Sequence, residues 1–242
     1  MKTQADWFTY WFDTPYYHIL YKDRDDTDAR IFMQNITSFL KLPLQSHVLD
    51  LACGKGRHSV FLNSLGYQVT GADLSKNNIE HANKFSNNRL DFIQHDMRDS
   101  FNNSYNAIFN LFTSFGYFKD DSEDIQVLKN IKNGLKKNGI AVIDFLNVTS
   151  VQNNLVTKEI KSIEGIDFHI HKKIENGFII KEISFDIDDT HHSYFERVKY
   201  LDLKKFTHYF KEAGLTINHI FGDYNLSSFE ENSSDRLIFV VS

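Results

Sequence analysis

Cysteine and long apolar runs are scarce in this chain of 242 residues. The one cysteine, Cys53, cannot form an internal disulfide and fits a reducing cytosol. No apolar run approaches the length that crosses a bilayer, and the N-terminus is aromatic and acidic where a signal peptide would be basic and then apolar. These absences predict a cytoplasmic protein without a membrane partner.

An excess of positive charge is missing as well. The chain has 27 lysines and arginines against 32 aspartates and glutamates, which gives a net charge of −5, and it has no strongly basic block. A protein that binds long nucleic acid through its phosphates needs such a block. We therefore expect no long nucleic acid as a partner.

A glycine-rich turn between a short apolar strand and a helix is the feature around which the chain is organised. Residues 48–51 are typical of a buried strand, Gly54 and Gly56 follow, and a helical pattern starts near Ser59. Because glycine has no Cβ, such a turn lets backbone N–H groups and a helix N-terminus approach a ligand. A later acid, Asp73, ends the next apolar run, where a carboxylate can accept both hydroxyls of a ribose. The third glycine of a dinucleotide fingerprint is absent, since Ser59 takes its place.

Strand and helix patterns alternate between about residues 48 and 145, which predicts parallel strands joined by helical crossovers. The expected strands are 48–51, 67–73, 90–95, 105–111 and 140–145, and a helix is expected from about 122 to 137, ended by Asn138-Gly139. Ligands bind at the carboxyl ends of such strands. Asp50, Asp73, Asp96 and Asn110 all fall at these ends, so we expect these polar side chains around one crevice.

A change of period after residue 150 predicts a separate antiparallel sheet. Apolar and polar residues alternate from about 156 to 201, and Asn176-Gly177 is typical of a tight hairpin turn because both residues tolerate positive φ. The α/β pattern resumes at Asp202 and ends with two strands, 215–223 and 236–241. The expected fold class is α/β, with a doubly wound, mostly parallel seven-stranded sheet and a small antiparallel β insertion.

The expected division of the chain has three parts. Residues 1–43 form an N-terminal helical lid, residues 44–150 and 202–242 form the core, and residues 151–201 form the insertion. The lid is rich in aromatic residues, which at helical spacing either pack a peripheral helix against the body or cover a ligand. The insertion either covers a substrate or forms a dimer interface, so a homodimer is left open.

The segment Asp50-Leu51-Ala52-Cys53-Gly54-Lys55-Gly56, followed by Asp73, resembles the cofactor motif of the class I S-adenosylmethionine-dependent methyltransferases. The resemblance covers about residues 44–147 and 202–242, where the closing helix, strand, loop and strand look like the family's terminal hairpin. It implies a Rossmann-like fold, S-adenosyl-L-methionine as the cofactor, and methyl transfer by in-line displacement.

The resemblance also implies a role for the residues at the strand ends. Asp50 would hold the amino group of the cofactor, Asp73 the ribose hydroxyls and Asp96 the adenine amine, while Asn110 would line the floor beneath the sulfonium. Taken alone, Asp50 and Asp96 also fit simple turn caps. The full set of implied cofactor-binding residues is Asp50, Ala52, Gly54, Gly56, Arg57, Asp73, Leu74, Asp96, Met97 and Asn110.

The segment after the fourth strand favours a small-molecule acceptor, methylated at nitrogen or oxygen. It reads Asn110-Leu111-Phe112-Thr113-Ser114-Phe115-Gly116-Tyr117, unlike the Asn-Pro-Pro-Tyr type of methyltransferases that act on amide or base nitrogens. The position of Cys53 in the cofactor loop also argues against the thiol chemistry that methylates a pyrimidine carbon. The insertion resembles one that roofs the site in small-molecule N-methyltransferases.

Aromatic faces suit a positive sulfonium, and this property selects the expected substrate pocket. Its aromatic residues are Tyr17, Tyr21, Phe112, Phe115 and Tyr117, and Arg24 would join them if the N-terminal segment forms a lid over a ligand. The catalytic residue stays unknown, because a base is needed only if the acceptor carries a proton; the candidates are His58, Tyr21 and His171. The histidines between positions 169 and 192 lack a cysteine or acid at fixed spacing, so no metal is expected.

Two other functions are compatible with parts of this pattern. An NAD-dependent oxidoreductase also uses a strand–glycine–helix turn and a later acid, but it predicts a third glycine and a Tyr-x-x-x-Lys pair, which we do not find. A non-catalytic regulator that binds S-adenosylmethionine would keep the cofactor site and close the acceptor cavity.

Overall fold

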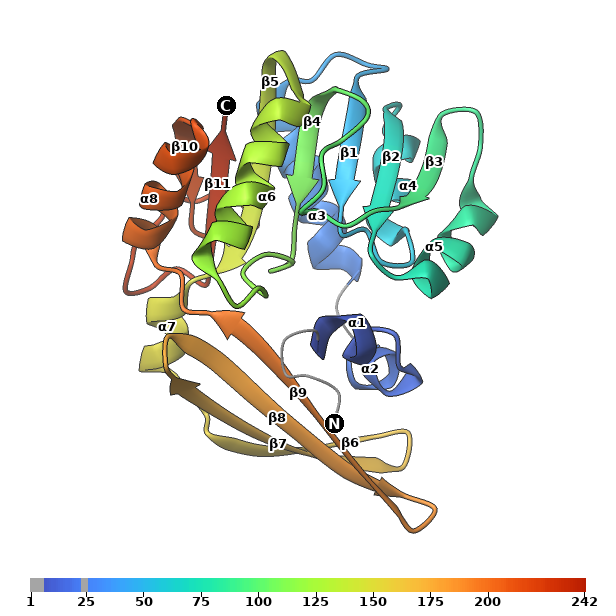
Figure 1. Ribbon diagram of the computed structural model, residues 1–242, viewed down its shortest axis with the longest axis vertical. Coiled ribbons are helices and arrows are strands. Elements are labelled where there is room, and N and C mark those ends of the chain that lie inside the picture. Colours follow the sequence, from blue (N-terminus) through green and yellow to red (C-terminus); the bar gives the residue numbers. More distant parts are fainter. Residues whose placement is uncertain (1–6, 23–25) are drawn as a thin grey trace.

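The computed structural model describes residues 7–22 and 26–242, although the side chains of residues 26–28 are left undescribed. An α/β body lies at one end and a separate antiparallel sheet at the other, with two short N-terminal helices between them (Figure 1). This arrangement confirms the expected fold class. Within the described residues, no helix has the length and apolar character needed to cross a membrane.

The body is built on a seven-stranded sheet with the order β10-β11-β5-β4-β1-β2-β3. All neighbouring strands are parallel except β11, which is antiparallel to both β5 and β10. This is the terminal hairpin that the sequence led us to expect. The strands are β1 (His47–Leu51), β2 (Gln68–Asp73), β3 (Leu90–Gln94), β4 (Tyr105–Asn110), β5 (Leu135–Leu146), β10 (Ile217–Phe221) and β11 (Arg236–Val241).

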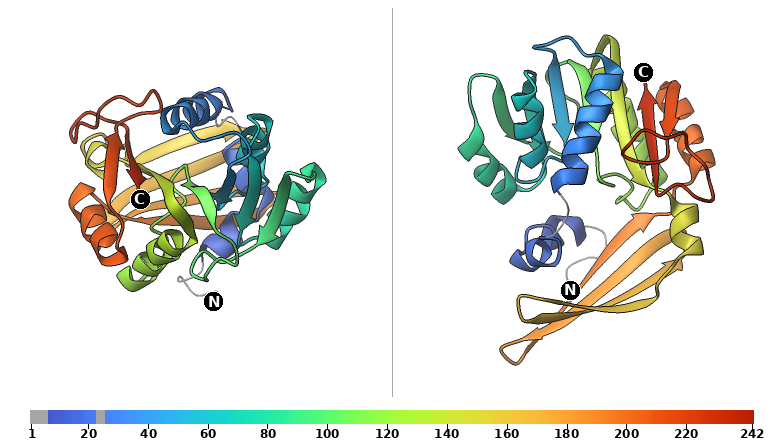
Figure 2. Two further views of the ribbon diagram at one scale, coloured as in Figure 1. Left: turned by 90° about the horizontal axis from the view of Figure 1, so that it is seen from above. Right: turned by 180° about the vertical axis from the view of Figure 1, so that it is seen from behind.

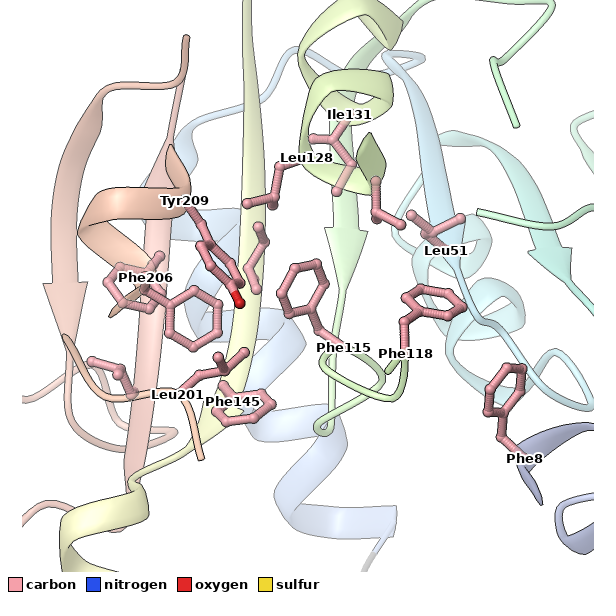
Figure 3. Close-up of a cluster of buried hydrophobic side chains, with 14 of the residues drawn as sticks. Phe8, Leu51, Phe115, Phe118, Leu128, Ile131, Phe145, Leu201, Phe206 and Tyr209 are labelled. Atoms are coloured by element: carbon pink, nitrogen blue, oxygen red, sulfur yellow. The ribbon is translucent and has the colours of Figure 1, made fainter. Parts of the chain in front are cut away.

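Helices cover both faces of this sheet, and each face has its own apolar core (Figures 1 and 2). One face packs against α3 (Asp26–Leu40), α4 (Arg57–Ser64) and α5 (Lys76–Ala82), which is followed by a short 3-10 helix, η2 (Asn83–Phe85). The other face packs against α6 (Asp121–Gly134) and α8 (Leu203–Ala213). Figure 3 shows side chains of the second core, among them Phe206 and Tyr209 of α8 and Leu128 and Ile131 of α6.

Two local features differ from the sequence-based expectation. Helix α6 ends at Gly134 and not near residue 137, because Leu135 already pairs with Tyr105 of β4. Asn138 has a positive φ of 62°, so the following residues form an irregularity inside β5 instead of a helix end. A short helix, α7 (Val148–Asn153), was not expected; it begins after Asn147, whose side chain accepts a hydrogen bond from the Thr149 N–H.

The insertion forms a four-stranded antiparallel sheet with the order β6-β7-β8-β9. Its strands are β6 (Lys158–Ile163), β7 (Ile166–Glu175), β8 (Phe178–Ile187) and β9 (Thr190–Lys199). The inner face, which carries the buried side chains Phe168, Ile170, Ile183 and Phe185, is covered by α1 (Trp7–Trp11) and α2 (Pro15–Leu20). Two ring contacts join these parts, Trp11 to Tyr194 at 4.7 Å and Tyr16 to Phe185 at 4.8 Å.

A buried ion pair fastens the end of β9 to the body. Lys199 Nζ lies 2.5 Å from Asp124 Oδ2 and 3.0 Å from Asp121 Oδ1, and the Lys199 N–H donates to the Gly116 carbonyl. Burial raises the pKa of Asp124 to about 7, although the Lys199 cation pulls in the opposite direction. The side chains of Lys199 and Asp124 are therefore both shielded from water.

We expect Lys199→Met to lower the free energy of unfolding by about 3–5 kcal/mol, because it leaves the Asp124 charge buried without its partner. Lys205→Met is the matched control. Its ammonium pairs with Asp121 at 2.6 Å, but 41% of its side chain is exposed, so the expected loss is below about 1 kcal/mol. Urea denaturation of both variants tests this, and equal losses would contradict the role given to the buried pair.

Candidate functional site

The candidate site lies at the carboxyl edge of the parallel strands. From the centre of the sheet, β1, β2 and β3 follow one another in one direction while β4 and β5 follow in the other, so the strand order reverses between β1 and β4. Ligands of open α/β sheets bind at such a switch point. Figures 1 and 2 show that this edge faces α1, α2 and the antiparallel sheet. Asp50, Asp73 and Asn110 all lie at or next to it.

The two glycines of the turn after β1 serve different purposes. Gly54 has a φ of 55°, and apart from Gly54 itself and its two chain neighbours no residue of the described chain has an atom within 4 Å of the position that a Cβ would take. Gly56 has a φ of 83°, but a Cβ there would lie 2.6 Å from the Phe92 ring. Gly54 therefore leaves space in which a ligand can approach the backbone, whereas Gly56 allows α4 to pack closely against β3.

Two carboxylates flank this turn in different environments. Asp50 is 2% exposed and accepts a hydrogen bond from Ser59 Oγ at 2.6 Å, and burial raises its pKa from 3.8 to about 6, although bonds from Ser59 oppose the rise. Asp73 accepts from the Gly54 N–H at 2.8 Å and from the Ser75 N–H at 2.9 Å, and burial raises its pKa as well. Asp73 thus fixes the backbone of the turn, while Asp50 is bonded by Ser59 and has no cation of the described chain beside it.

Asn110 carries the clearest sign of a missing partner. Its side chain is fully buried, and Nδ2 donates to the Leu51 carbonyl at 3.1 Å. Its Oδ1 is buried and has no hydrogen-bond partner in the described chain. A buried acceptor left unpaired costs about 1–3 kcal/mol. A ligand that brings a donor or a positive centre to the switch point would remove this cost.

Asp96 is engaged by a neighbouring side chain of its own loop. Both of its oxygens accept from Arg98, with Nη2 at 2.6 Å, and Arg98 Nη1 also lies 2.9 Å from Glu123 of α6. Partial burial would raise the pKa of Asp96, but the bonds from Arg98 outweigh it and lower this pKa. Of the other residues expected here, Leu74 and Met97 are half-buried against the core. Arg57 is exposed at the start of α4.

Only some of the residues expected in the substrate pocket lie together in the structure. Phe115 is 1% exposed and packs against Phe206 at 5.7 Å, so it belongs to the core shown in Figure 3 and not to a ligand-facing surface. Arg24 lies outside the described residues. Phe12, which was not predicted, joins the remaining parts, because its ring lies 4.9 Å from Tyr17 and 5.6 Å from Tyr117.

Tyr21 belongs to a polar cluster on the inner face of the antiparallel sheet. Its hydroxyl donates to Glu196 Oε1 at 2.6 Å and contacts the Lys181 ammonium, and Trp11 Nε1 donates to the same Glu196 oxygen at 2.8 Å. The sequence analysis missed Glu196 and Lys181. Alternation in the insertion places these two residues on one face, but it does not indicate which face turns toward the body.

The two histidine candidates for a catalytic base lie in different places. Burial, aided by the Arg57 cation, lowers the pKa of His58 to about 3, so its imidazole is neutral at physiological pH and a weak base. His171 lies on the outer face of the antiparallel sheet, where Nδ1 is 3.1 Å from Glu182, away from the carboxyl edge. In the described part of the chain, no three His, Cys, Asp or Glu side chains lie close enough to hold a metal ion.

Residues 48–139 match the family described as a methyltransferase domain. This segment contains the turn after β1, both flanking carboxylates and Asn110. Over this segment, which is less than half of the chain, the chain is similar to methyltransferases. The resemblance noted in the sequence is therefore confirmed, and an NAD-dependent oxidoreductase is not favoured.

Similar proteins extend this result. A putative methyltransferase of Bacillus subtilis (strain 168), YqeM, is 35% identical over 107 residues, 43% of either chain. The dTDP-3-amino-3,4,6-trideoxy-alpha-D-glucopyranose N,N-dimethyltransferase of Streptomyces venezuelae is 29% identical over 105 residues, 43% of this chain and 44% of that protein. Both alignments span less than half of the relative's length.

A solved structure matches nearly the whole chain. The S-adenosylmethionine-dependent methyltransferase of Clostridium acetobutylicum ATCC 824 superposes with a TM-score of 0.78 and 20% identity, covering 94% of this chain and 95% of its own. At 20% identity the match shows a shared fold. Because the match covers 94% of this chain, the shared fold extends into the antiparallel sheet.

S-adenosyl-L-methionine is the cofactor of this domain, and the edge of the sheet fits it. The space beside Gly54 lets the cofactor approach the backbone of the turn after β1. The unpaired Oδ1 of Asn110 suits a positive sulfonium, and the Asp73 carboxylate suits ribose hydroxyls. The buried Asp50, which has a raised pKa and no cation of the described chain beside it, suits an ammonium group.

Asp50 also gives the stability of the protein a defined pH dependence. Since its pKa rises from 3.8 to about 6 on folding, the folded protein holds a proton in this range that the unfolded chain has lost, and stability falls as the pH rises. Asp50→Asn should therefore gain about 3 kcal/mol relative to wild type between about pH 4 and 7. Asp99→Asn, on an exposed side chain, is the matched control. Urea denaturation across this range tests the difference, and a result equal to the control at every pH would contradict it.

Proposed function

We propose that the protein transfers the methyl group of S-adenosylmethionine to an amine nitrogen of a small molecule bound between the carboxyl edge of the sheet and the antiparallel sheet. The observation that carries this proposal is the cover over the edge. Helices α1 and α2 and the inner face of the insertion stand opposite the switch point (Figure 2). Such a cover suits a small acceptor better than a long polymer.

The choice of nitrogen draws on one relative. The Streptomyces venezuelae protein is named for N,N-dimethylation of an amino sugar nucleotide, and it shares 29% of its aligned residues with this chain. An oxygen acceptor is the alternative that the experiment below separates. Of the expected N-terminal lid, residues 1–43, only α1 and α2 would cover the acceptor together with residues 151–201, because α3 packs on a face of the body's sheet. Residues 44–150 and 202–242 would hold the cofactor.

Within this proposal, the residues at the edge hold the cofactor, which supplies an electrophilic methyl group when bound. Asp50 would bind its amino group, Asp73 its ribose hydroxyls, and Asn110 Oδ1 would face its sulfur. The remaining contacts would come from Ala52, Gly54, Gly56, Arg57, Leu74, Asp96 and Met97.

The acceptor side would be formed by residues of the lid, the loop after β4 and the insertion. The rings of Phe12, Tyr17 and Tyr117 would exclude water from the reacting atoms, which lowers the cost of solvent reorganisation. Tyr21, hydrogen-bonded to Glu196, would accept a hydrogen bond from the acceptor amine, or take its proton while its own hydroxyl proton passes to the Glu196 carboxylate.

A cytoplasmic location agrees with the single cysteine, Cys53, which is buried and free. A homodimer would use the outer face of the antiparallel sheet, where a hollow of about 1040 Å³ is lined by side chains that include Ile180, Phe195 and Arg197. Sedimentation velocity tests the dimer, and a monomer at every concentration would refute it.

Asp73→Asn should weaken the binding of S-adenosylmethionine by about 2–3 kcal/mol, the scale of lost charge-assisted hydrogen bonds. Asparagine keeps one acceptor for the Gly54 turn, so the fold should survive. Isothermal titration calorimetry measures this, with Asp99→Asn as the control and NAD as a ligand that should not bind. An unchanged dissociation constant would show that Asp73 does not bind the ribose.

Methyl transfer itself is tested by incubating the protein with S-adenosylmethionine and panels of primary amines, amino sugars and hydroxyl compounds. We expect a methylated amine by mass spectrometry, formed with equimolar S-adenosylhomocysteine. Tyr21→Phe should lower the rate at least about tenfold. Tyr10→Phe, which changes an exposed ring stacked on Tyr194, should not. Methylated hydroxyl compounds alone would refute the nitrogen acceptor, and tight cofactor binding without turnover would favour the non-catalytic regulator.

A further inference from the structure

The turn after β4 has a backbone conformation that its residues do not favour. Phe112 and Thr113 have φ values of 57° and 62°, in the left-handed region. For residues with a Cβ this region costs roughly 1–2 kcal/mol each, and a β-branched threonine is especially unusual there. Surrounding groups must therefore hold the turn in place.

A single residue of the neighbouring strand bonds both strained positions. Asp144, at the carboxyl end of β5, has a fully buried side chain. Its Oδ2 accepts from the Phe112 N–H at 2.7 Å, and its backbone carbonyl accepts from the Thr113 N–H at 3.0 Å. The two left-handed residues are thus bonded to one carboxylate and one carbonyl of the same residue.

Arg236, the first residue of β11, connects this carboxylate to the turn. Its Nε and Nη2 lie 2.8 Å and 2.7 Å from Asp144 Oδ1, and Nη2 also donates to Thr113 Oγ1 at 3.0 Å. The guanidinium further lies 5.4 Å from the Tyr224 ring centre. Because a guanidinium is planar and rigid, these bonds fix the distance between Asp144 and Thr113.

The turn in question lies at the switch point and touches both sides of the site. Its first residue, Phe112, is two positions after Asn110, and its ring lies 4.5 Å from His58 at the start of α4. Its second residue, Thr113, accepts through its carbonyl a 2.5 Å hydrogen bond from the Tyr117 hydroxyl. The Tyr117 ring, which contacts the rings of Trp7 and Phe8 of α1, is therefore tied to this turn.

We propose that Asp144 and Arg236 are positioning residues that hold the Phe112–Thr113 turn so that it frames the methyl end of the bound cofactor. The inference rests on the proposed function, since it assigns the switch point to the transferred methyl group. Asp144 and Arg236 act through the turn and do not themselves touch the cofactor.

The test compares two ligands that differ at the methyl position. S-adenosylmethionine carries the methyl group and a positive sulfur, whereas S-adenosylhomocysteine carries neither. The ratio of their dissociation constants, measured by calorimetry, reports how well the protein frames that position. A purely structural role would weaken both ligands alike and leave the ratio unchanged.

We expect Arg236→Met to change this ratio by about fivefold or more, equal to about 1 kcal/mol, while the constant for S-adenosylhomocysteine stays within about twofold. Arg236→Lys keeps the charge but loses the planar fork, so it should recover only part of the ratio. Thr113→Val removes only the hydroxyl that Arg236 bonds and should shift the ratio in the same direction. It also keeps the test sound if Arg236→Met does not fold. Arg89→Met, on an exposed side chain of the body, is the control.

The possible outcomes distinguish a failure of this inference from a failure of the proposed function. A shifted ratio in the Arg236 and Thr113 variants, with an unchanged ratio in Arg89→Met, supports the inference. A normal wild type whose ratio is unchanged in Arg236→Met and Thr113→Val overturns the inference alone, as does an equal loss for both ligands. A wild type that binds neither ligand overturns the proposed function, and the inference with it.

Discussion

Parallel pairing of β1 with both β2 and β4 is the constraint on which the rest of the structure depends. Because parallel strands end at one edge, Asp50, Asp73 and Asn110 converge although they are far apart in the sequence. Since the strand order reverses between β1 and β4, the loops after these two strands lie next to each other. One loop supplies the open backbone at Gly54 and the other the strained turn that begins at Phe112.

Three buried carboxylates around this framework differ in how their charge is compensated. Asp124 has the ammonium of Lys199, and Asp144 has the guanidinium of Arg236. Ser59 donates to the Asp50 carboxylate, and burial raises the pKa of Asp50 to about 6 with no cation of the described chain opposing the rise. An ammonium group on a ligand would complete the third site in the way that protein cations complete the other two. Two of these carboxylates are thus paired with cations of the protein, whereas in the described chain the third is not.

Much of the fold was predictable because its signals are local. The strand–glycine–helix unit depends on a few adjacent residues, and so does the hairpin turn at Asn176-Gly177. These elements and their order were predicted, and with them the seven-stranded sheet. The end of α6 was placed too late because the pairing of Leu135 with β4, a tertiary contact, overrides the helical pattern.

The sequence by itself therefore determined the elements, their order and the edge at which polar groups gather, since these follow from local periodicity and from the geometry of parallel strands. Only the tertiary structure decided which way loop and insertion side chains turn. It buried Phe115 against Phe206, paired Arg98 with Glu123 of α6, and brought Glu196 to Tyr21. The reason is physical: side-chain direction outside regular elements depends on packing between segments that are distant in sequence, and no local pattern encodes those contacts.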